Sequence, residues 1–146
     1  MKRDGGFTLI EIMMVLVIGV AAYLLILAVP MRGASSADLK AAARSLAAGL
    51  RQAQTIAMST KRDTALTLDL DTREFTVTGD DTVRQVAKQL ELKLFTAQSE
   101  VTSEKRGAIR FYPDGSSTGG RITVAAGEHK YLVDVDWLTG RVAITD

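Results

Sequence analysis

Gly6, Phe7 and Glu11 can together create a charge and then neutralise it. If the chain is cut after Gly6, the new N-terminus is the α-amine of Phe7, which is cationic or nearly so at neutral pH. Glu11 lies four residues further on, so in a helical array its carboxylate can neutralise the terminal amine of a neighbouring chain. These residues therefore predict an ion pair that proteolysis makes possible and that sets the axial register between subunits.

The segment that holds Glu11 is long enough to cross a membrane. Twenty uncharged residues follow it, from Ile12 to Met31, and a helix of that length spans about 30 Å, close to the hydrocarbon thickness of a bilayer. A carboxylate at mid-bilayer costs roughly 2.5–3.5 kcal/mol, so Glu11 requires a partner. Cleavage after Gly6 supplies one. It also explains why the segment is apolar all round, because such a helix must be soluble in lipid first and packed against other helices later.

Two simpler interpretations of the N-terminus stay open. Lys2 and Arg3, followed by an apolar run and Ala34-Ser35-Ser36-Ala37, have the order of a secretory signal peptide. The run is longer than the usual core of about 7–15 residues, however, and an acid sits in its first turns. An uncut single-span anchor explains the length and the cationic flank, which favours a cytoplasmic N-terminus. That anchor leaves Glu11 and the glycines before Phe7 unexplained.

Composition indicates a small mature protein without net charge. At 146 residues the chain has room for one modest domain. Removing Lys2, Arg3 and Asp4 lowers the counts of basic and acidic residues from 18 and 17 to 16 and 16. A neutral chain has no field that steers it toward nucleic acid or anionic lipid. The chain has no cysteine, which excludes a disulfide framework and cysteine-based metal or nucleophile chemistry.

A second helix is predicted from Ala37 to about Ser59. Pro30 and Gly33 loosen the chain before it, and Ser36 is placed to cap it. Apolar residues at three- and four-residue spacing make one narrow stripe, formed by Leu39, Ala43, Leu46, Leu50, Ala53 and Ala57. The stripe is rich in alanine and too short for three clean heptads, so we expect it to pack against a sheet rather than form a coiled-coil seam.

After this helix the apolar residues alternate with a period of two, which is typical of strands. Turns are predicted at Asp71-Thr72-Arg73, Gly79-Asp80-Asp81 and Leu138-Thr139-Gly140. Val83–Gln89 fits either a strand or an exposed connection, and Gln98–Gly107 fits a surface loop. Short strands at this spacing indicate antiparallel β-structure covered by the helix on one side. The alternating residues are Leu66, Leu68, Leu70, Phe75, Val77, Leu90, Leu92, Leu94, Ile109, Phe111, Ile122, Val124, Tyr131, Val133, Val135, Trp137, Val142 and Ile144.

The titratable residues form no recognisable catalytic set. His129 is the only histidine and follows Gly127-Glu128 in a predicted turn, where a lone histidine is more often solvated than a general base. The sequence has no Ser-x-x-Lys motif and no nucleophile elbow. Acids occur in pairs without a legible oxygen-ligand loop for calcium, at Asp69/Asp71, Asp80/Asp81 and Asp134/Asp136. We therefore expect no enzyme, with no catalytic residue, no cofactor and no metal.

The first residues resemble a known family. Lys2-Arg3-Asp4-Gly5-Gly6, followed by Phe7-Thr8-Leu9-Ile10-Glu11 and an unbroken apolar run, is similar to the class III leader and mature start of type IV pilins and type II secretion pseudopilins. The resemblance implies cleavage after Gly6 by a prepilin peptidase that also N-methylates Phe7. It further implies that Glu11 is the assembly glutamate and that Pro30 kinks the helix.

The C-terminal half narrows the resemblance. The stretch from Phe111 through Pro113-Asp114-Gly115 to Gly120, with Gly140-Arg141-Val142 near the end, resembles the H-type minor pseudopilins and the FimT-like minor pilins. DNA-binding members of the FimT-like group carry Gly-Arg-x-Arg, whereas Ala143 stands here in place of the second arginine. Phosphate contacts dominate non-specific DNA affinity, so this loss and the neutral charge favour secretion. Five cations could still lie close together in the fold and bind phosphate: Lys105, Arg106, Arg110, Arg121 and Arg141.

The resemblance implies a fold and a division of the chain. The expected fold class is α+β and pilin-like, with a long N-terminal transmembrane and amphipathic helix packed on an antiparallel β-sheet domain. The expected parts are a prepilin leader at 1–6, a transmembrane and assembly helix at 7–31, a periplasmic part of that helix at 32–62 and a globular β-domain at 63–146. The chain is expected to cross the inner membrane once, with its C-terminal domain in the periplasm.

The implied function is structural. We expect a minor pseudopilin at or near the tip of the type II secretion pseudopilus that supports export of folded proteins across the outer membrane. Its expected partners are the other minor pseudopilins, the major pseudopilin, the prepilin peptidase and methyltransferase, the inner membrane and, as an option, the secreted substrates; nucleic acid is not favoured. The alternatives are a FimT-like minor pilin of a type IV pilus, for fibre assembly or DNA uptake, and an uncut single-pass membrane-anchored binding module.

Overall fold

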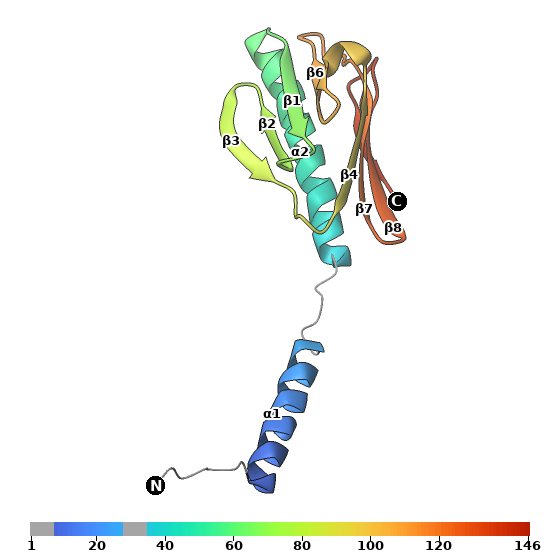
Figure 1. Cartoon of the computed structure of the whole chain (residues 1–146). Coiled ribbons are helices and arrows are strands. Elements are labelled where there is room, and N and C mark those ends of the chain that lie inside the picture. Colours follow the sequence, from blue (N-terminus) through green and yellow to red (C-terminus); the bar gives the residue numbers. More distant parts are fainter. Residues whose placement is uncertain (1–7, 28–34) are drawn as a thin grey trace. The chain divides into compact units, whose positions relative to one another are not determined.

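A computed structural model describes residues 8–27 and 35–146 of the chain. They fall into two compact units, which are treated separately below: one lies within residues 1–32 and the other within 33–146 (Figure 1). The first unit contains helix α1 (Leu9–Leu27). The second contains helix α2 (Ser36–Thr60), a short 3-10 helix, η1 (Gln98–Glu100), and all the strands of the described residues.

Helix α1 is apolar on every side. Its described side chains, from Leu9 to Leu24, are exposed, and Glu11 is the acid of its first turn. Neither α1 nor α2 has, within the described residues, the length and hydropathy that would mark a membrane-crossing helix. The span predicted at 7–31 extends beyond α1 into residues 7 and 28–31, which lie outside the described ranges, as does the predicted kink at Pro30.

Helix α2 begins with a capping box. The Ser35 side chain accepts from the Asp38 backbone N–H at 3.1 Å, and the Asp38 carboxylate accepts from the Ser35 N–H at 3.2 Å. The cap is therefore Ser35, and the prediction of Ser36 was wrong by one residue, because only Ser35 has an acid three positions ahead of it. The helix ends at Lys61, which adopts a left-handed conformation with φ 56°.

The strands form two antiparallel sheets. The first has the order β3-β2-β1-β6-β5 and the second the order β4-β7-β8-β9. Contacts between β4 and β6 join the sheets, and the Thr96 hydroxyl donates to the Ala108 carbonyl at 2.6 Å across this junction. The bounds are β1 (Thr64–Asp69), β2 (Glu74–Val77), β3 (Asp80–Gln85), β4 (Glu91–Thr96), β5 (Val101–Ser103), β6 (Arg106–Phe111), β7 (Gly120–Ala126), β8 (His129–Val135) and β9 (Val142–Thr145).

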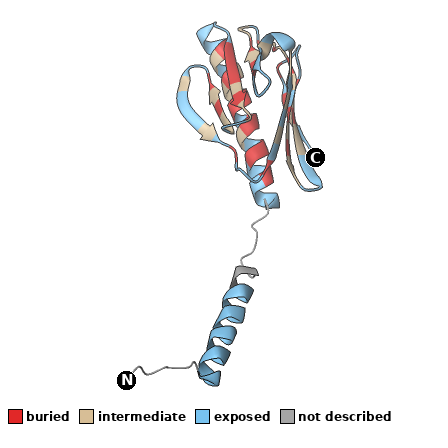
Figure 2. Cartoon of the chain, viewed as in Figure 1, coloured by how far each residue is buried: buried red, intermediate tan, exposed pale blue. Residues whose placement is uncertain are grey.

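The hydrophobic core lies where α2 meets both sheets. Helix α2 contacts β1, β2 and β6 of the first sheet and β7, β8 and β9 of the second, so its buried stripe runs along the inner faces of the strands (Figure 2). All six residues of the predicted stripe, from Leu39 to Ala57, are buried. The largest fully buried side chains facing them are Phe75 and Phe111. The predicted pilin-like α+β fold is confirmed, but its strands form two sheets.

Gly49 allows the closest approach of α2 to the first sheet. A Cβ atom at this position would lie 2.9 Å from Cε2 of Phe75 and 3.0 Å from Cδ1 of Leu66. Both distances are shorter than van der Waals contact, so the backbone of α2 lies directly on these two core side chains. Glycine in the middle of a helix costs up to about 1 kcal/mol relative to alanine, and here the packing offsets that cost.

The structure decides one ambiguous prediction, and two other stretches differ from theirs. The range Val83–Gln89, predicted as either a strand or an exposed connection, is divided: Val83 to Gln85 end β3, and the residues after them form a connection in which Val86 is buried. Gln98–Gly107, predicted as a loop, contains η1, β5 and the start of β6, because backbone groups of β5 pair with β6 whatever the side chains are. Trp137, expected to share the inward face of β8, lies two residues beyond the end of that strand and is 66% exposed.

Candidate functional site

The carboxylate predicted to drive assembly lies at the start of α1. Glu11 is in the first turn, where its backbone N–H donates to the Thr8 carbonyl at 3.0 Å. The positive end of the helix macrodipole favours a carboxylate there by about 0.3–1 kcal/mol. The side chain is exposed, so it is free to contact another chain. Gly6 and Phe7, predicted as the cleavage site, lie outside the described residues.

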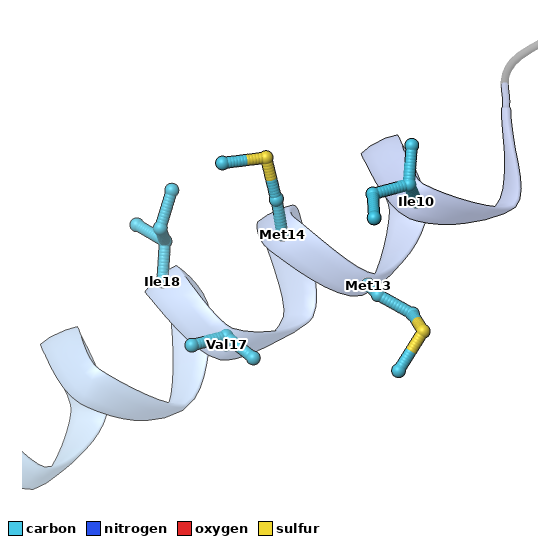
Figure 3. A pocket seen from close by; sticks show the side chains of 5 residues that line it. All are labelled: Ile10, Met13, Met14, Val17 and Ile18. Atoms are coloured by element: carbon cyan, nitrogen blue, oxygen red, sulfur yellow. The ribbon is translucent and has the colours of Figure 1, made fainter.

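One face of α1, beginning beside Glu11, presents a row of apolar side chains. Figure 3 shows them along the helix, and their spacing of three and four residues places them on neighbouring turns. They line a shallow apolar hollow and are Ile10, Met13, Met14, Val17 and Ile18. Two flexible methionines in this row can adapt to differently shaped neighbours. The face therefore suits contact with lipid or with other helices.

In the second unit, α2 holds together the two segments of the C-terminal resemblance. The Gln54 amide Nε2 donates to the Gly115 carbonyl at 2.9 Å and to the Thr139 carbonyl at 3.2 Å. The Ser117 N–H adds a further link by donating to the Trp137 carbonyl at 2.8 Å. The loop after β6 and the loop after β8 thus form one surface, which we call the two-loop end.

Gly140 lies against the other loop of the two-loop end. This residue is buried and has φ 63°, a region that side-chain-bearing residues rarely adopt. A Cβ atom there would collide with the Gly115 carbonyl oxygen and lie 2.5 Å from Nε2 of Gln54. Only glycine fits both the backbone conformation and the space. The Gly140-Arg141 segment is therefore needed by the packing of the two-loop end.

Asp136 shapes the second of these loops. Its carboxylate accepts from the backbone N–H groups of Leu138 and Thr139, at 3.0 and 2.8 Å, and from the Thr139 hydroxyl at 2.9 Å. The backbone hydrogen bond from Thr139 is the main reason why the pKa of Asp136 is lowered. This turn ends the strand, which explains why Trp137 does not continue the inward face of β8.

Most of the cations that could have formed a DNA-binding cluster are held by carboxylates. Arg106 pairs with Asp69 at 2.6 Å, Lys105 with Asp71 at 2.9 Å and Arg110 with Glu100 at 2.9 Å, and Arg121 pairs with Asp134. Three of these cations lie on or directly before β6, and the fourth pair joins β7 to β8. The arrangement neutralises each cation locally, so these four do not add up to one positive field.

The same pairs account for most of the acids considered for calcium. Asp69, Asp71 and Asp134 are paired with cations, and Asp136 is engaged in its turn. No set of three or more histidine, aspartate or glutamate side chains placed to hold a metal occurs in residues 8–27 and 35–146. His129, at the first position of β8, is exposed.

Sequence reasoning missed the role of Gln54. It lies off the apolar stripe of α2 and is half-buried, and a glutamine on a helix flank has the pattern of a solvated residue. Its role is visible only in the structure, where the carbonyl groups of Gly115 and Thr139, from two distant loops, both accept from its side-chain amide.

The fold and the apolar α1 define a pilin-like subunit. The structure is similar to that of the minor pseudopilin EpsH from the type 2 secretion system of Vibrio cholerae, with a TM-score of 0.58 and 16% identity over 74% of this chain and 96% of that chain. It is equally similar to the type IV minor pilin FimU of Pseudomonas aeruginosa, with a TM-score of 0.57 and 15% identity over 74% and 93% of the two chains. These likenesses establish the fold and do not separate the two fibre systems.

The sequence comparisons distinguish the type II secretion system from the type IV pilus. Residues 42–139 match the family model of the type II transport protein GspH, and residues 1–22 match the prokaryotic N-terminal methylation motif. The type II secretion system protein H of Xanthomonas campestris pv. campestris is 31% identical over 141 residues, which cover 97% of this chain and 83% of the relative. The chain belongs to the GspH family, the H-type minor pseudopilins of type II secretion. The predicted family and function class are thereby confirmed.

Proposed function

We propose that this chain is a structural subunit at or just below the tip of a type II secretion pseudopilus, where it supports export of folded proteins across the outer membrane. The observation that carries the proposal is a single exposed carboxylate, Glu11, in the first turn of an otherwise apolar helix, in a chain of the GspH family. A helix of this kind suits assembly through its side chains and has no evident use in a free periplasmic protein.

Maturation creates the partner of Glu11. A prepilin peptidase removes the leader, residues 1–6, after Gly6 and methylates the amine of Phe7. The match of residues 1–22 to the N-terminal methylation motif supports this step. The Glu11 carboxylate of one subunit then pairs with the Phe7 amine of a neighbour, which offsets the cost of a charge in an apolar setting.

The helix at 7–31 anchors the subunit in the inner membrane before assembly, with the leader in the cytoplasm. Residues 32–62 continue into the periplasm, and the β-domain at 63–146 lies there and contacts neighbouring subunits. The proposed partners are the major pseudopilin and the other minor pseudopilins. The subunit acts by binding, and its proposed function includes no catalytic step, cofactor or nucleic acid.

A second candidate is a minor pilin of a type IV pilus. The fold is compatible with it, because the likeness to FimU is as close as that to EpsH. The curated relative and the pairing of Arg106, Arg110 and Arg121 with carboxylates favour secretion. Deletion of the gene should abolish release of secreted enzymes and leave twitching and transformation intact. The opposite phenotype would support the pilus.

Intact-mass measurement of the membrane-extracted protein tests maturation. We expect a chain that begins at N-methylated Phe7. Retention of Met1 to Gly6 would support the remaining candidate, an uncut single-pass anchored binding module.

The role of Glu11 is tested by replacing it in the full chain. Glu11→Ala should block or slow incorporation into the fibre while membrane insertion and cleavage continue. Glu11→Gln keeps the shape without the charge, so it should fail equally. Normal fibre incorporation of both variants would refute the ion pair.

A further inference from the structure

Strand β3 forms one edge of the first sheet (Figure 1) and buries none of its side chains. Asp80 and Arg84 are half-buried and its other residues are exposed, with Val83 at 55%. By contrast, its neighbour β2 buries Phe75 and Val77. Burial of apolar surface, the dominant stabilising term in folding, therefore contributes little to the position of β3.

The pairing of β3 with β2 is also interrupted. Asp80 lies opposite Val77, and Arg84 lies opposite Phe75, with a shift of register between the two pairs. Three residues of β3 therefore face a single residue of β2, so the regular ladder is broken between them. The backbone N–H of Thr82, in the middle of the three, donates at 3.0 Å to the carboxylate of Asp80 in its own strand.

Three polar side chains fasten β3 to α2, and we call Gln52, Asp80 and Arg84 the clasp. The Gln52 amide Nε2 donates to the Asp80 carboxylate at 2.8 Å, and Nη2 of Arg84 donates to the Gln52 amide oxygen at 2.9 Å. The same Nη2 donates to the Asp80 carboxylate at 2.9 Å, which closes a triangle of polar contacts. Among the described residues of α2, only Gln52 bonds to β3 through its side chain.

The cation of the clasp lies against a core aromatic ring. The guanidinium carbon of Arg84 is 5.9 Å from the centroid of the Phe75 ring, a distance at which the ring attracts a cation. Its Nη1 atom is buried and has no acceptor within the described residues, so the closed clasp leaves one donor unused, which is unfavourable. The clasp thus holds β3 through polar contacts that water can replace once the strand moves out.

We infer that β3 is a strap that opens as one piece: the clasp and the pairing with β2 separate while the core between α2 and both sheets stays folded. Local openings occur where few buried apolar contacts hold a segment, and β3 meets that condition. Opening leaves the outer edge of β2 without a partner, and an unpaired edge can accept another extended chain. The state of the clasp therefore sets which strand ends the first sheet. The inference concerns this chain alone and does not depend on the proposed function.

Native-state hydrogen exchange of the full chain in detergent micelles, read by mass spectrometry, tests the strap. A local opening exposes little surface, so low concentrations of urea should leave the exchange rate of segment 80–85 unchanged. The same concentrations should raise the rates of β1 and β6, because their exchange requires wider unfolding. A rate at 80–85 that rises with urea as steeply as the rate of β1 would overturn the inference.

Two substitutions on α2 separate the clasp from general stability. Gln52→Ala should raise the exchange rate of segment 80–85 at least about tenfold, equivalent to about 1.4 kcal/mol of opening free energy. The matched control is Gln54→Ala, whose side chain bonds to Gly115 and Thr139 instead. Those bonds stay intact when the strap opens, so the control should leave the rate at 80–85 unchanged. Equal rates at 80–85 in the two variants would overturn the inference.

A reversible disulfide locks the strap. Glu74 on β2 lies opposite Gln85 on β3, and the Gln85 amide donates to the Glu74 carboxylate at 2.8 Å. Opposite residues of antiparallel strands lie within the Cα separation that a disulfide requires, and the chain has no cysteine of its own. In the Glu74→Cys and Gln85→Cys double variant, oxidation should slow exchange at 80–85 at least about tenfold, and more than it slows β1. Equal slowing of both segments, or none, would overturn the inference.

Discussion

The side-chain amide of Gln54 donates to the backbone carbonyl oxygen of Gly115 at 2.9 Å, across 61 positions of sequence. The same amide nitrogen reaches the Thr139 carbonyl at 3.2 Å. One side chain on α2 therefore fixes both loops, and within residues 8–27 and 35–146 no other side chain of that helix donates a hydrogen bond to both. The geometry of the two-loop end depends on α2 as well as on the sheets.

Gln54→Ala should lower the free energy of unfolding by about 1–3 kcal/mol, because it leaves the carbonyl group of buried Gly115 and that of exposed Thr139 without their donor. Chemical denaturation of the purified protein measures the loss. The control is Thr55→Ala, whose hydroxyl bonds only to the Arg51 carbonyl of its own helix and whose loss should change stability by less than about 0.5 kcal/mol. Similar losses in the two variants would contradict the proposed linking role.

Gly140→Ala should destabilise the chain much more than Gly127→Ala. Both glycines have positive φ, 63° and 59°, so both variants incur the conformational cost of about 1–2 kcal/mol. A Cβ atom at position 127 meets nothing within 4 Å, whereas at position 140 it collides with the Gly115 carbonyl. We expect a loss of about 3 kcal/mol or more for Gly140→Ala, since the backbone must move. Thermal unfolding compares the two, and equal melting temperatures would show that the close approach is absent.

Gly49→Ala should destabilise the chain although alanine is the better helix former. The gain in propensity is about 1 kcal/mol, while overpacking against Phe75 and Leu66 costs about 1–3 kcal/mol. In a Phe75→Leu background the smaller side chain should relieve the overlap, so that Gly49→Ala becomes neutral or stabilising. A double-mutant cycle by denaturation measures this coupling. Additive effects would indicate that α2 and Phe75 are not in close contact.

Asp80 should make stability depend on acid pH. Hydrogen bonds from the side chain and backbone of Thr82, and then from Gln52, lower its pKa to about 2. A lowered pKa stabilises the folded chain above the unfolded value of about 3.9, and this contribution is lost as the pH falls toward 2. Asp80→Asn should therefore lower the melting temperature at pH 5, and the difference from the unmodified chain should shrink between pH 4 and pH 2. Asp81 is exposed, and its side chain makes no hydrogen bond or ion pair with the described part of the chain, so we expect Asp81→Asn to change the melting temperature little at any of these pH values.

The spacing of apolar residues predicted those helices and strands in which buried residues recur at a regular interval. The stripe from Leu39 to Ala57 is buried because an α-helix returns to the same face every three or four residues. The strands around Leu66, Phe75 and Ile122 followed from alternation for the same reason. Alternation does not tell which strands pair, however, and the division into two sheets depends on contacts between segments far apart in the chain.

Local interactions explain most of the differences between the predicted and the observed structure. Trp137 continued an alternating pattern, but the Asp136 carboxylate turns the backbone at that point. Val101 and its polar neighbours were expected in a loop, yet they pair with β6 through backbone groups that any residue possesses. Gln54 gave no sequence signal because an amide on a helix flank is ordinarily solvated. Gly6, Phe7 and Pro30 lie outside the described residues, so their roles stay predictions.

The capping box at Ser35 and Asp38 has a consequence for the order of folding. The first backbone N–H groups of a helix have no partner within the helix. Here the Ser35 side chain accepts from the Asp38 N–H and the Asp38 side chain accepts from the Ser35 N–H, so the cap is built within four consecutive residues. Nucleation is the unfavourable step in helix formation, and α2 carries its own means of achieving it. The helix can thus begin at Ser36 in water, independently of whether α1 is in lipid or in a fibre. Local capping of this kind favours a second unit that stays folded whatever surrounds α1.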